Sequence, residues 1–179
     1  MIRRPQYATA LALAASVFTA SLWGLSTEPA DAQSSWRRYS DQRLGISIEV
    51  PREGFIDVSG ETQGEGIDLK AVDGTGEISV YSAALTSLSF KAFRQQLIKG
   101  AEDRGLDVTY RDGGQSWFVF SGLLDDHILY YKVLLKTVCG VPTAQQFHLR
   151  YPREKKRDYD AIVERMERTL ARSPQVRCS

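Results

Sequence analysis

Two carboxylates beside an imidazole are the residues of this sequence best suited to catalysis. They stand together in Asp125-Asp126-His127, and a second imidazole, His148, follows later in the chain. Such groups bind divalent metals and exchange protons near neutral pH. Alternate residues of an extended segment share one face, so Asp125 and His127 would lie together, and His148 would join them from a neighbouring strand. One hypothesis is therefore a metal-dependent or hydrolytic periplasmic enzyme that uses Asp125, His127 and His148.

A structural interpretation competes with this hypothesis and is the one we favour. The run follows Gly122-Leu123-Leu124, and aspartates are frequent in turns because their side chains hydrogen-bond to the local backbone. His148 stands in Gln146-Phe147-His148-Leu149, whose alternation predicts a strand with the imidazole on its less buried face. The sequence contains no nucleophile elbow, zinc-protease motif or Cys-x-x-Cys pair. We therefore expect no catalytic residue, no metal and no cofactor.

Basic side chains near the C-terminal end form the best candidate for a partner-binding surface. They are Arg150, Arg153, Lys155, Lys156 and Arg157. Residues 136–179 carry 10 basic and 5 acidic side chains, whereas residues 33–135 carry 11 and 15. A basic region of this kind attracts anionic lipid, glycan or an acidic protein. The open alternatives are a solvated helix face with one loop, or a peripheral protein that uses the Arg150–Arg157 patch at a membrane surface.

The first 32 residues have the pattern of a cleavable export signal. Arg3 and Arg4 precede residues 8–25, which hold no charged side chain, and Ala30-Asp31-Ala32 offers small residues at a signal peptidase site. An uncleaved membrane anchor is the less favoured alternative, because residues 8–25 barely reach the length of a membrane span and include four hydroxyl side chains. We predict a periplasmic or secreted protein in which residues 33–172 form a single domain and residues 173–179 form a C-terminal tail.

Export also bears on the cysteines and on the partner. Cys139 and Cys178 are the only two cysteines, and an even number in an exported chain predicts a disulfide. A reactive Cys139 is the alternative, but no histidine stands near it in the sequence. After cleavage we expect a monomer without a transmembrane segment. Its partner would be an envelope protein or a glycan rather than a nucleic acid.

Hydrophobic periodicity divides the mature chain into strands, a helix, more strands and a second helix. Strands are predicted at 36–40, 46–50, 67–72, 77–83, 107–111, 116–121, 127–138 and 143–151. Apolar residues at helical spacing predict helices at 90–101 and 159–170, with Ser87 or Ser89 as one cap and Asp158 as the other. Residues 153–157 are expected to form a basic loop and residues 60–66 a solvated loop. Three apolar residues before the latter, Phe55, Ile56 and Val58, are expected to be buried anchors.

Short turns between successive strands imply antiparallel pairing, since parallel neighbours need long crossovers. The prediction is an α+β fold in which an antiparallel sheet of about six to eight strands is flanked by two amphipathic helices, on one face or one on each. The aromatic runs Trp117-Phe118-Val119-Phe120 and Tyr130-Tyr131 would form an exposed glycan-binding stripe or pack across strands in the core. We favour the core.

The opening of the mature chain resembles that of PsbP-like domains, which are small exported α/β/α sandwiches. The residues that carry this resemblance are Tyr39-Ser40-Asp41, Leu44-Gly45-Ile46-Ser47-Ile48, Val50-Pro51 and Phe55. More narrowly, the pattern is similar to uncharacterised secreted proteins of alphaproteobacteria through Asp73-Gly74, Val108-Thr109-Tyr110 and the stretches 116–122 and 159–163. The resemblance implies a sheet flanked by helices and a binding or assembly role, and it carries over no catalytic residue. The favoured function is an exported, non-enzymatic protein that binds or assists an envelope component.

Overall fold

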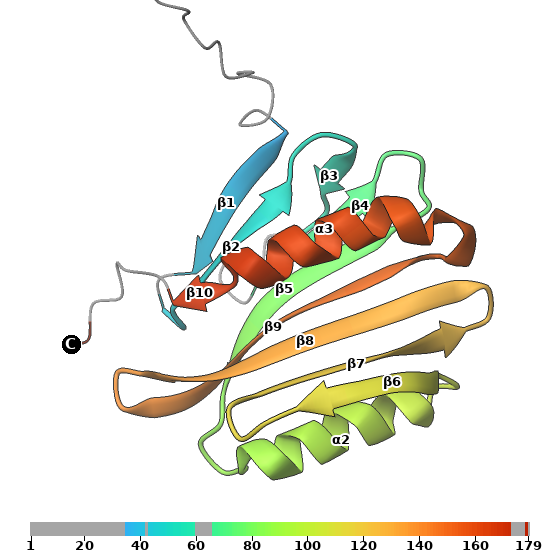
Figure 1. Cartoon of the computed structure of the whole chain (residues 1–179). Coiled ribbons are helices and arrows are strands. Elements are labelled where there is room, and N and C mark those ends of the chain that lie inside the picture. The colour runs from blue at the N-terminus through green and yellow to red at the C-terminus, as the bar shows by residue number, and fades with distance from the viewer. Residues whose placement is uncertain (1–34, 42, 60–65, 173–177, 179) are drawn as a thin grey trace, which may run out of the picture.

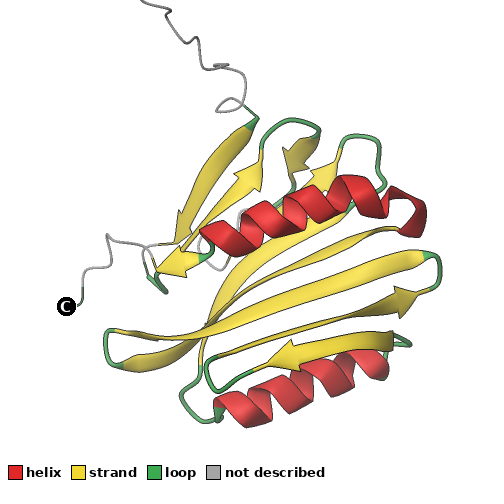
Figure 2. Ribbon diagram, in the orientation of Figure 1, coloured by secondary structure: helices red, strands yellow, loops and turns green. Residues whose placement is uncertain are grey.

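The computed structural model describes residues 35–41, 43–59, 66–172 and 178, which form two antiparallel sheets and two α-helices (Figures 1 and 2). The predicted leader, residues 1–32, lies outside the described residues. So does the predicted tail, residues 173–179, apart from Cys178. The predicted solvated loop also lies outside them, except for Gly66, which begins a strand.

The larger sheet has seven strands in the order β3-β4-β5-β9-β8-β7-β6, all antiparallel to their neighbours. The strands are β3 Phe55–Asp57, β4 Gly66–Ala71, β5 Glu77–Ala84, β6 Asp107–Gly113, β7 Trp117–Leu124, β8 His127–Val138 and β9 Val141–Pro152. Short turns connect successive strands, as the Asp-Gly motifs predict. The predicted α+β fold, with an antiparallel sheet flanked by two helices, is confirmed.

One helix packs on each face of this sheet. α2, Phe90–Glu102, begins where the Ser89 hydroxyl oxygen accepts a hydrogen bond from the Ala92 N–H at 3.2 Å. Its apolar stripe buries Ile98 and Ala101 against the α2 face, where Phe118 is fully buried. Of the two candidate caps, Ser89 is therefore the one that the structure uses.

The opposite face of the sheet packs against α3, Lys156–Thr169, and against a smaller sheet. The smaller sheet consists of β1 Trp36–Asp41, β2 Ile46–Pro51 and β10 Ala171–Arg172, in the order β1-β2-β10. Met166 of α3, Ile48 of β2 and Phe147 of β9 are fully buried together in this second core. The Gln145 side chain of β9 also donates to the Leu44 and Gly45 carbonyl oxygens at 3.0 and 2.7 Å. This polar contact joins β9 to the turn between β1 and β2.

The basic loop predicted at 153–157 is wrong. Arg153–Lys155 forms a single 3₁₀ turn, η1, and α3 starts directly afterwards at Lys156. Arginine and lysine are good helix formers, and Pro152 stands before the turn, where a missing backbone N–H costs nothing. Asp158 is accordingly not the cap; it lies in the first turn of α3, where a carboxylate interacts favourably with the helix dipole.

Two expectations about burial are also corrected. Ile56 and Val58 are not anchors, because 52% and 49% of their surface is exposed; only Phe55 packs against the core. Ile56 belongs to β3, and Val58 follows this strand. β3 is an edge strand of the main sheet, so one of its sides faces solvent. The strand predicted at 46–50 is buried more deeply than its alternation indicates, since Ser47, on its polar side, is only 2% exposed and Glu49 is half-buried.

The predicted disulfide is confirmed. Cys139, at the tip of the β8–β9 hairpin, is bonded to Cys178, with an S–S distance of 2.09 Å. The bond closes a loop that contains β9, α3 and β10. The C-terminal end of the chain is therefore tied to the longest hairpin of the main sheet.

Candidate functional site

The α3 face of the main sheet is only partly covered, and the uncovered part is the candidate site. α3 contacts β9 and β2, and Figure 1 shows β8, β7 and β6 continuing beyond it without a helix in front of them. We call this part of the sheet the open strip. The side chains of β8 lie nearest α3 and partly pack against its core, and Val119 of β7 is buried; the others are more open. The side chains of the strip come from alternate positions of three strands: Tyr110, Asp112, Trp117, Val119, Ser121, Leu123, Ile128, Tyr130, Lys132 and Leu134.

Strand register lines these side chains up in rows across the strip. Tyr110 is opposite Ser121, which is opposite Tyr130. A bulge between Val108 and Tyr110 changes the register of β6 at the outer edge of the strip. Tyr110 there is 50% exposed. The strip therefore offers aromatic surface to solvent.

A pocket of about 380 Å³ lies where the strip meets α3. Ser121, Leu123 and Tyr130 belong to its lining on the sheet side, and Val163 lines it from α3. Arg153, which precedes α3, also lines the pocket. Among the described residues, no carboxylate lies within ion-pair distance of this guanidinium. A hollow of this kind, with aromatic side chains and an unpaired arginine, suits recognition of another molecule.

A polar network fixes the side chains in the middle of the strip. The Tyr130 hydroxyl donates to Glu167 Oε1 at 2.5 Å, and Lys132 Nζ lies 3.1 Å from the same oxygen. The Lys132 ammonium also lies 4.4 Å from the centroid of the Trp117 ring, a cation–π contact. Burial raises the pKa of Tyr130 far above its usual range, and Glu167 acts in the same direction. The phenol therefore stays protonated and serves as a hydrogen-bond donor.

The five predicted basic residues lie in different surroundings. Arg150 lies in β9 opposite Glu77 and Leu129, on the α2 side of the sheet. Lys155 binds Asp73 Oδ2 at 2.5 Å, and Lys156 binds Asp160 Oδ2 at 2.7 Å. Arg157 is exposed in the first turn of α3. Of the five, Arg153 and Lys156 line the pocket beside α3.

The structure does not bring the predicted enzyme residues together. His127 is opposite Pro152 at one end of β8, whereas His148 is opposite Tyr131, four positions along that strand. At about 3.4 Å per residue, the backbones are roughly 14 Å apart along the strands. Asp125 lies in the turn before β8 with φ 53° and is exposed. In the described part of the chain, no group of three or more metal-ligating side chains is close enough to hold an ion.

His148 is instead held between aromatic rings on the α2 side of the sheet. Its ring stacks on Tyr131 at a centroid distance of 4.8 Å and meets the edge of Tyr81 at 5.9 Å. Burial lowers the pKa of His148 below its usual value; Asp68 and Glu77 oppose this effect and Arg104 adds to it. The imidazole is therefore neutral at pH 7. Its Nδ1 atom is buried without a partner among the described residues.

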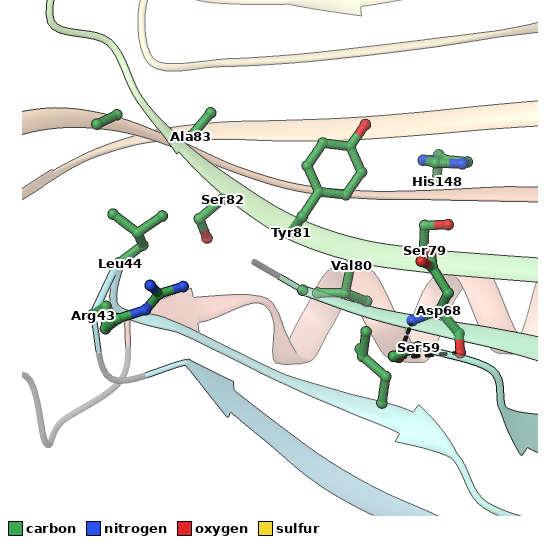
Figure 3. A pocket seen from close by; sticks show the side chains of 13 residues that line it. Arg43, Leu44, Ser59, Asp68, Ser79, Val80, Tyr81, Ser82, Ala83 and His148 are labelled. Atoms are coloured by element: carbon green, nitrogen blue, oxygen red, sulfur yellow. Dashed lines mark hydrogen bonds between the residues drawn. The ribbon is translucent and has the colours of Figure 1, made fainter. Parts of the chain in front are cut away.

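A second hollow, of about 760 Å³, opens at the edge of β5 (Figure 3). Six consecutive residues of β5, 79–84, line it, so it faces the edge of that strand rather than one face of the sheet. In Figure 3, Tyr81 and His148 lie on one side of β5 and Ser82 on the other, with Arg43 across the gap. Ser59 and Gly66 also line it, and these residues flank the stretch 60–65 that lies outside the described residues.

Sequence reasoning missed the open strip, although it identified the aromatic strands. Phe118 and Phe120 are fully buried, as the favoured core interpretation predicts, but Trp117 is half-buried on the strip. The available signal was the alternation in β7. Trp117, Val119, Ser121 and Leu123 alternate with the buried phenylalanines and face the other side of the sheet, where Val119 is buried and the other three are half-buried. The alternation predicts that β7 has a second face with side chains of its own. It does not predict which strands of the sheet α3 covers.

Comparison with known proteins finds a likeness of fold only. No family model matches the chain, and no curated protein sequence matches it. Its structure is similar to that of the Ran-binding protein Mog1p of Saccharomyces cerevisiae, with a TM-score of 0.50 and 13% sequence identity over 76% of this chain and 94% of Mog1p. A point variant of Mog1 matches with the same score and identity over 76% of this chain and 95% of its own. These likenesses place the chain in a class of α+β domains.

In the described residues, no helix is long and apolar enough to cross a membrane.

Proposed function

We propose that this chain is an exported, non-enzymatic protein that binds a protein partner of the cell envelope through the open strip. The observation that carries the proposal is the strip itself. An antiparallel sheet buries a face under helices or leaves it to solvent, and here Tyr110, Trp117 and Leu123 remain on a partly covered face. Tryptophan, tyrosine and arginine are the residue types that contribute most to protein–protein binding.

Three further observations support the proposal. The leader pattern at residues 1–32 favours export, and the Cys139–Cys178 disulfide is the kind of bond that persists in an oxidising compartment. Mog1p, whose fold is similar, is described as a Ran-binding protein, so a domain of this shape can serve as a protein-binding module. Arg153, which has no ion-pair partner in the described part of the chain, and the pocket beside α3 supply a specific contact point next to the aromatic surface.

The test is cross-linking in intact cells with the full chain, tagged at its C-terminus. We expect a discrete cross-linked adduct with the wild type and a yield about tenfold lower for Trp117→Ala, because truncation of a buried aromatic anchor is costly. Ile56→Ala is the matched control, since Ile56 is 52% exposed at the opposite edge of the sheet. Equal loss of the adduct in both variants, or in neither, contradicts binding through the strip.

Export is tested separately on the same cells. N-terminal sequencing of the purified protein should begin at Gln33, and osmotic shock should release the protein from the cells. An intact leader on protein that stays with the cytoplasmic fraction contradicts the location.

A further inference from the structure

The open strip has the width of one α-helix. Neighbouring strands lie about 4.8 Å apart, so the three strands β6, β7 and β8 span roughly 10–14 Å. A helix with its side chains is about 10–12 Å across. On this face of the sheet, α3 and the smaller sheet already cover the neighbouring strands. A single helix laid beside α3 would complete the layer.

The charges on the strip differ between its two ends. Arg153 lies at the end where α3 begins, next to the row formed by Leu123 and Ile128. Asp112 lies further along, in the row of Val119 and Lys132. Lys132 is paired with Glu167, and Lys156 with Asp160. Among the described residues that form the strip or line the pocket beside it, Arg153 and Asp112 are therefore the charges without an oppositely charged partner.

The positive charge of Arg153 at one end of the strip and the negative charge of Asp112 further along favour one direction for a bound helix. A helix carries a partial negative charge at its C-terminal end and a partial positive charge at its N-terminal end. The C-terminal end would therefore lie over Arg153 and the N-terminal end near Asp112. Since α3 has its own N-terminal end next to Arg153, the bound helix would run antiparallel to α3. Adjacent antiparallel helices also have favourably opposed dipoles.

We infer that the open strip receives an amphipathic helix of the partner protein, antiparallel to α3, with its apolar side on Trp117 and Leu123 and its C-terminal turn at Arg153. This inference rests on the proposed function and adds the conformation and the direction of the bound segment. About 14 residues of helix match the length of α3, which is 14 residues long. Recognition would follow the helix-in-groove mode, with anchors spaced three and four residues apart.

Photo-cross-linking from two positions measures this geometry directly. p-Benzoylphenylalanine is placed at Leu123 in one variant and at Asp112 in another, in the exported full chain. Asp112 is opposite Val119, four residues before Leu123, so the two probes are about 13 Å apart along the strip. A helix rises 1.5 Å per residue, and about nine residues of a helical partner span that distance; an extended segment needs only about four. Mass spectrometry then locates both attachment points in the partner.

The expected result is a spacing of about nine residues, with the residue attached at Leu123 on the C-terminal side of the one attached at Asp112. A spacing near four, or the reverse order, overturns the inferred helix or its direction while leaving binding through the strip intact. Adducts from neither position, with adducts from a probe at Arg111, overturn the proposed function as well. Arg111 is the matched control because it precedes Asp112 in β6 and contacts Glu102 of α2 on the other face.

The contribution of the Arg153 charge to binding is measured with the same photo-cross-linking probe at Leu123. Arg153→Glu should lower the yield of that adduct about tenfold, because it places a carboxylate beside the C-terminal end of the helix. Arg157→Glu, in the first turn of α3 but outside the pocket lining, should leave the yield unchanged. Equal yields for Arg153→Glu and the wild type contradict the inferred direction. Both variants should keep the wild-type melting temperature, since both side chains are exposed.

Discussion

Gly76 shows how closely a single backbone position can be packed. A Cβ atom added there would lie 1.9 Å from the Tyr159 hydroxyl oxygen and 2.6 Å from its Cζ atom. The Tyr159 ring cannot easily move away, because it is buried and stacked on Tyr151 at a centroid distance of 4.5 Å. Gly76→Ala should therefore lower the free energy of unfolding by about 1–3 kcal/mol, the usual cost of an overpacked core.

Gly100→Ala is the matched control for that variant, measured by the same urea titrations. Gly100 lies inside α2, and the nearest atom to an added Cβ is the flexible Arg104 end at 3.5 Å. Alanine is the better helix former, so this variant should be more stable by up to about 1 kcal/mol. A Gly76→Ala protein as stable as the wild type would contradict the packing described for Tyr159.

His148 makes the stability of the protein depend on pH. Burial lowers the pKa of His148 below its usual 6.5, so the unfolded chain binds this proton more tightly than the folded one does. The free energy of unfolding should therefore fall as the pH decreases from about 6.5 through the folded pKa. His148→Gln should show a smaller loss of stability between pH 7 and pH 5 in denaturant titrations. His127→Gln, whose imidazole is not stacked between tyrosines, is the control, and an identical pH profile for His148→Gln and the wild type would count against this account.

The alternation of apolar and polar residues predicts which face of a sheet a side chain occupies. It does not predict the distance between two side chains that lie on the same face but on different strands. The alternation in β9 correctly places His148 on a less buried face than Phe147 and Leu149. The hypothesis that joined it to His127 required a register in which the two histidines are adjacent. Register depends on the lengths of both strands and on the turn between them, and here the β8–β9 turn at Cys139-Gly140 separates them.

The start of α2 illustrates how one hydrogen bond defines the end of an element. The Ser89 side chain satisfies the Ala92 N–H, which has no partner within the helix. Ser89→Ala should lower the free energy of unfolding by about 1 kcal/mol, the usual effect of losing an N-cap. Ser87→Ala, two residues earlier and exposed, should leave it unchanged. Thermal denaturation of both variants checks the difference, and equal melting temperatures would rule out Ser89 as the cap.

Elements with strong local signals were predictable, and those that depend on tertiary contacts were not. The β4–β5 hairpin follows from its Asp73-Gly74 turn, and α2 follows from its apolar spacing. The three-residue strand β3 carries no periodicity, and its existence depends on pairing with β4. The open strip is equally invisible in the sequence, because it is defined by the strands that α3 leaves uncovered.

At the scale of the whole molecule, the disulfide restrains a large part of the chain. The two cysteines are 39 residues apart, and α3, which forms one side of the pocket beside the open strip, lies between them. Cys139→Ser with Cys178→Ser should cost about 4 kcal/mol of stability, by the loss of a constraint on the unfolded chain. Calorimetry should then show a melting temperature lower by about 10 °C or more.

The control for the disulfide is the wild type melted with and without reductant. The reduced wild type should match the double serine variant, since both lack the covalent loop. A reduced protein that melts at the temperature of the oxidised one would contradict a stabilising role. The leader, on which the predicted location depends, is a prediction from sequence alone.

The long strand β8 contributes alternate side chains to two separate cores, with Tyr130 facing α3 and Tyr131 facing α2. Inserting or deleting one residue within it would exchange these two sets, sending Lys132 into the α2 core and Val133 to the outer layer. Changes of length in related genes should therefore be confined to the hairpin ends on either side of β8. Within β8 itself, related sequences should differ by substitutions and not by insertions or deletions.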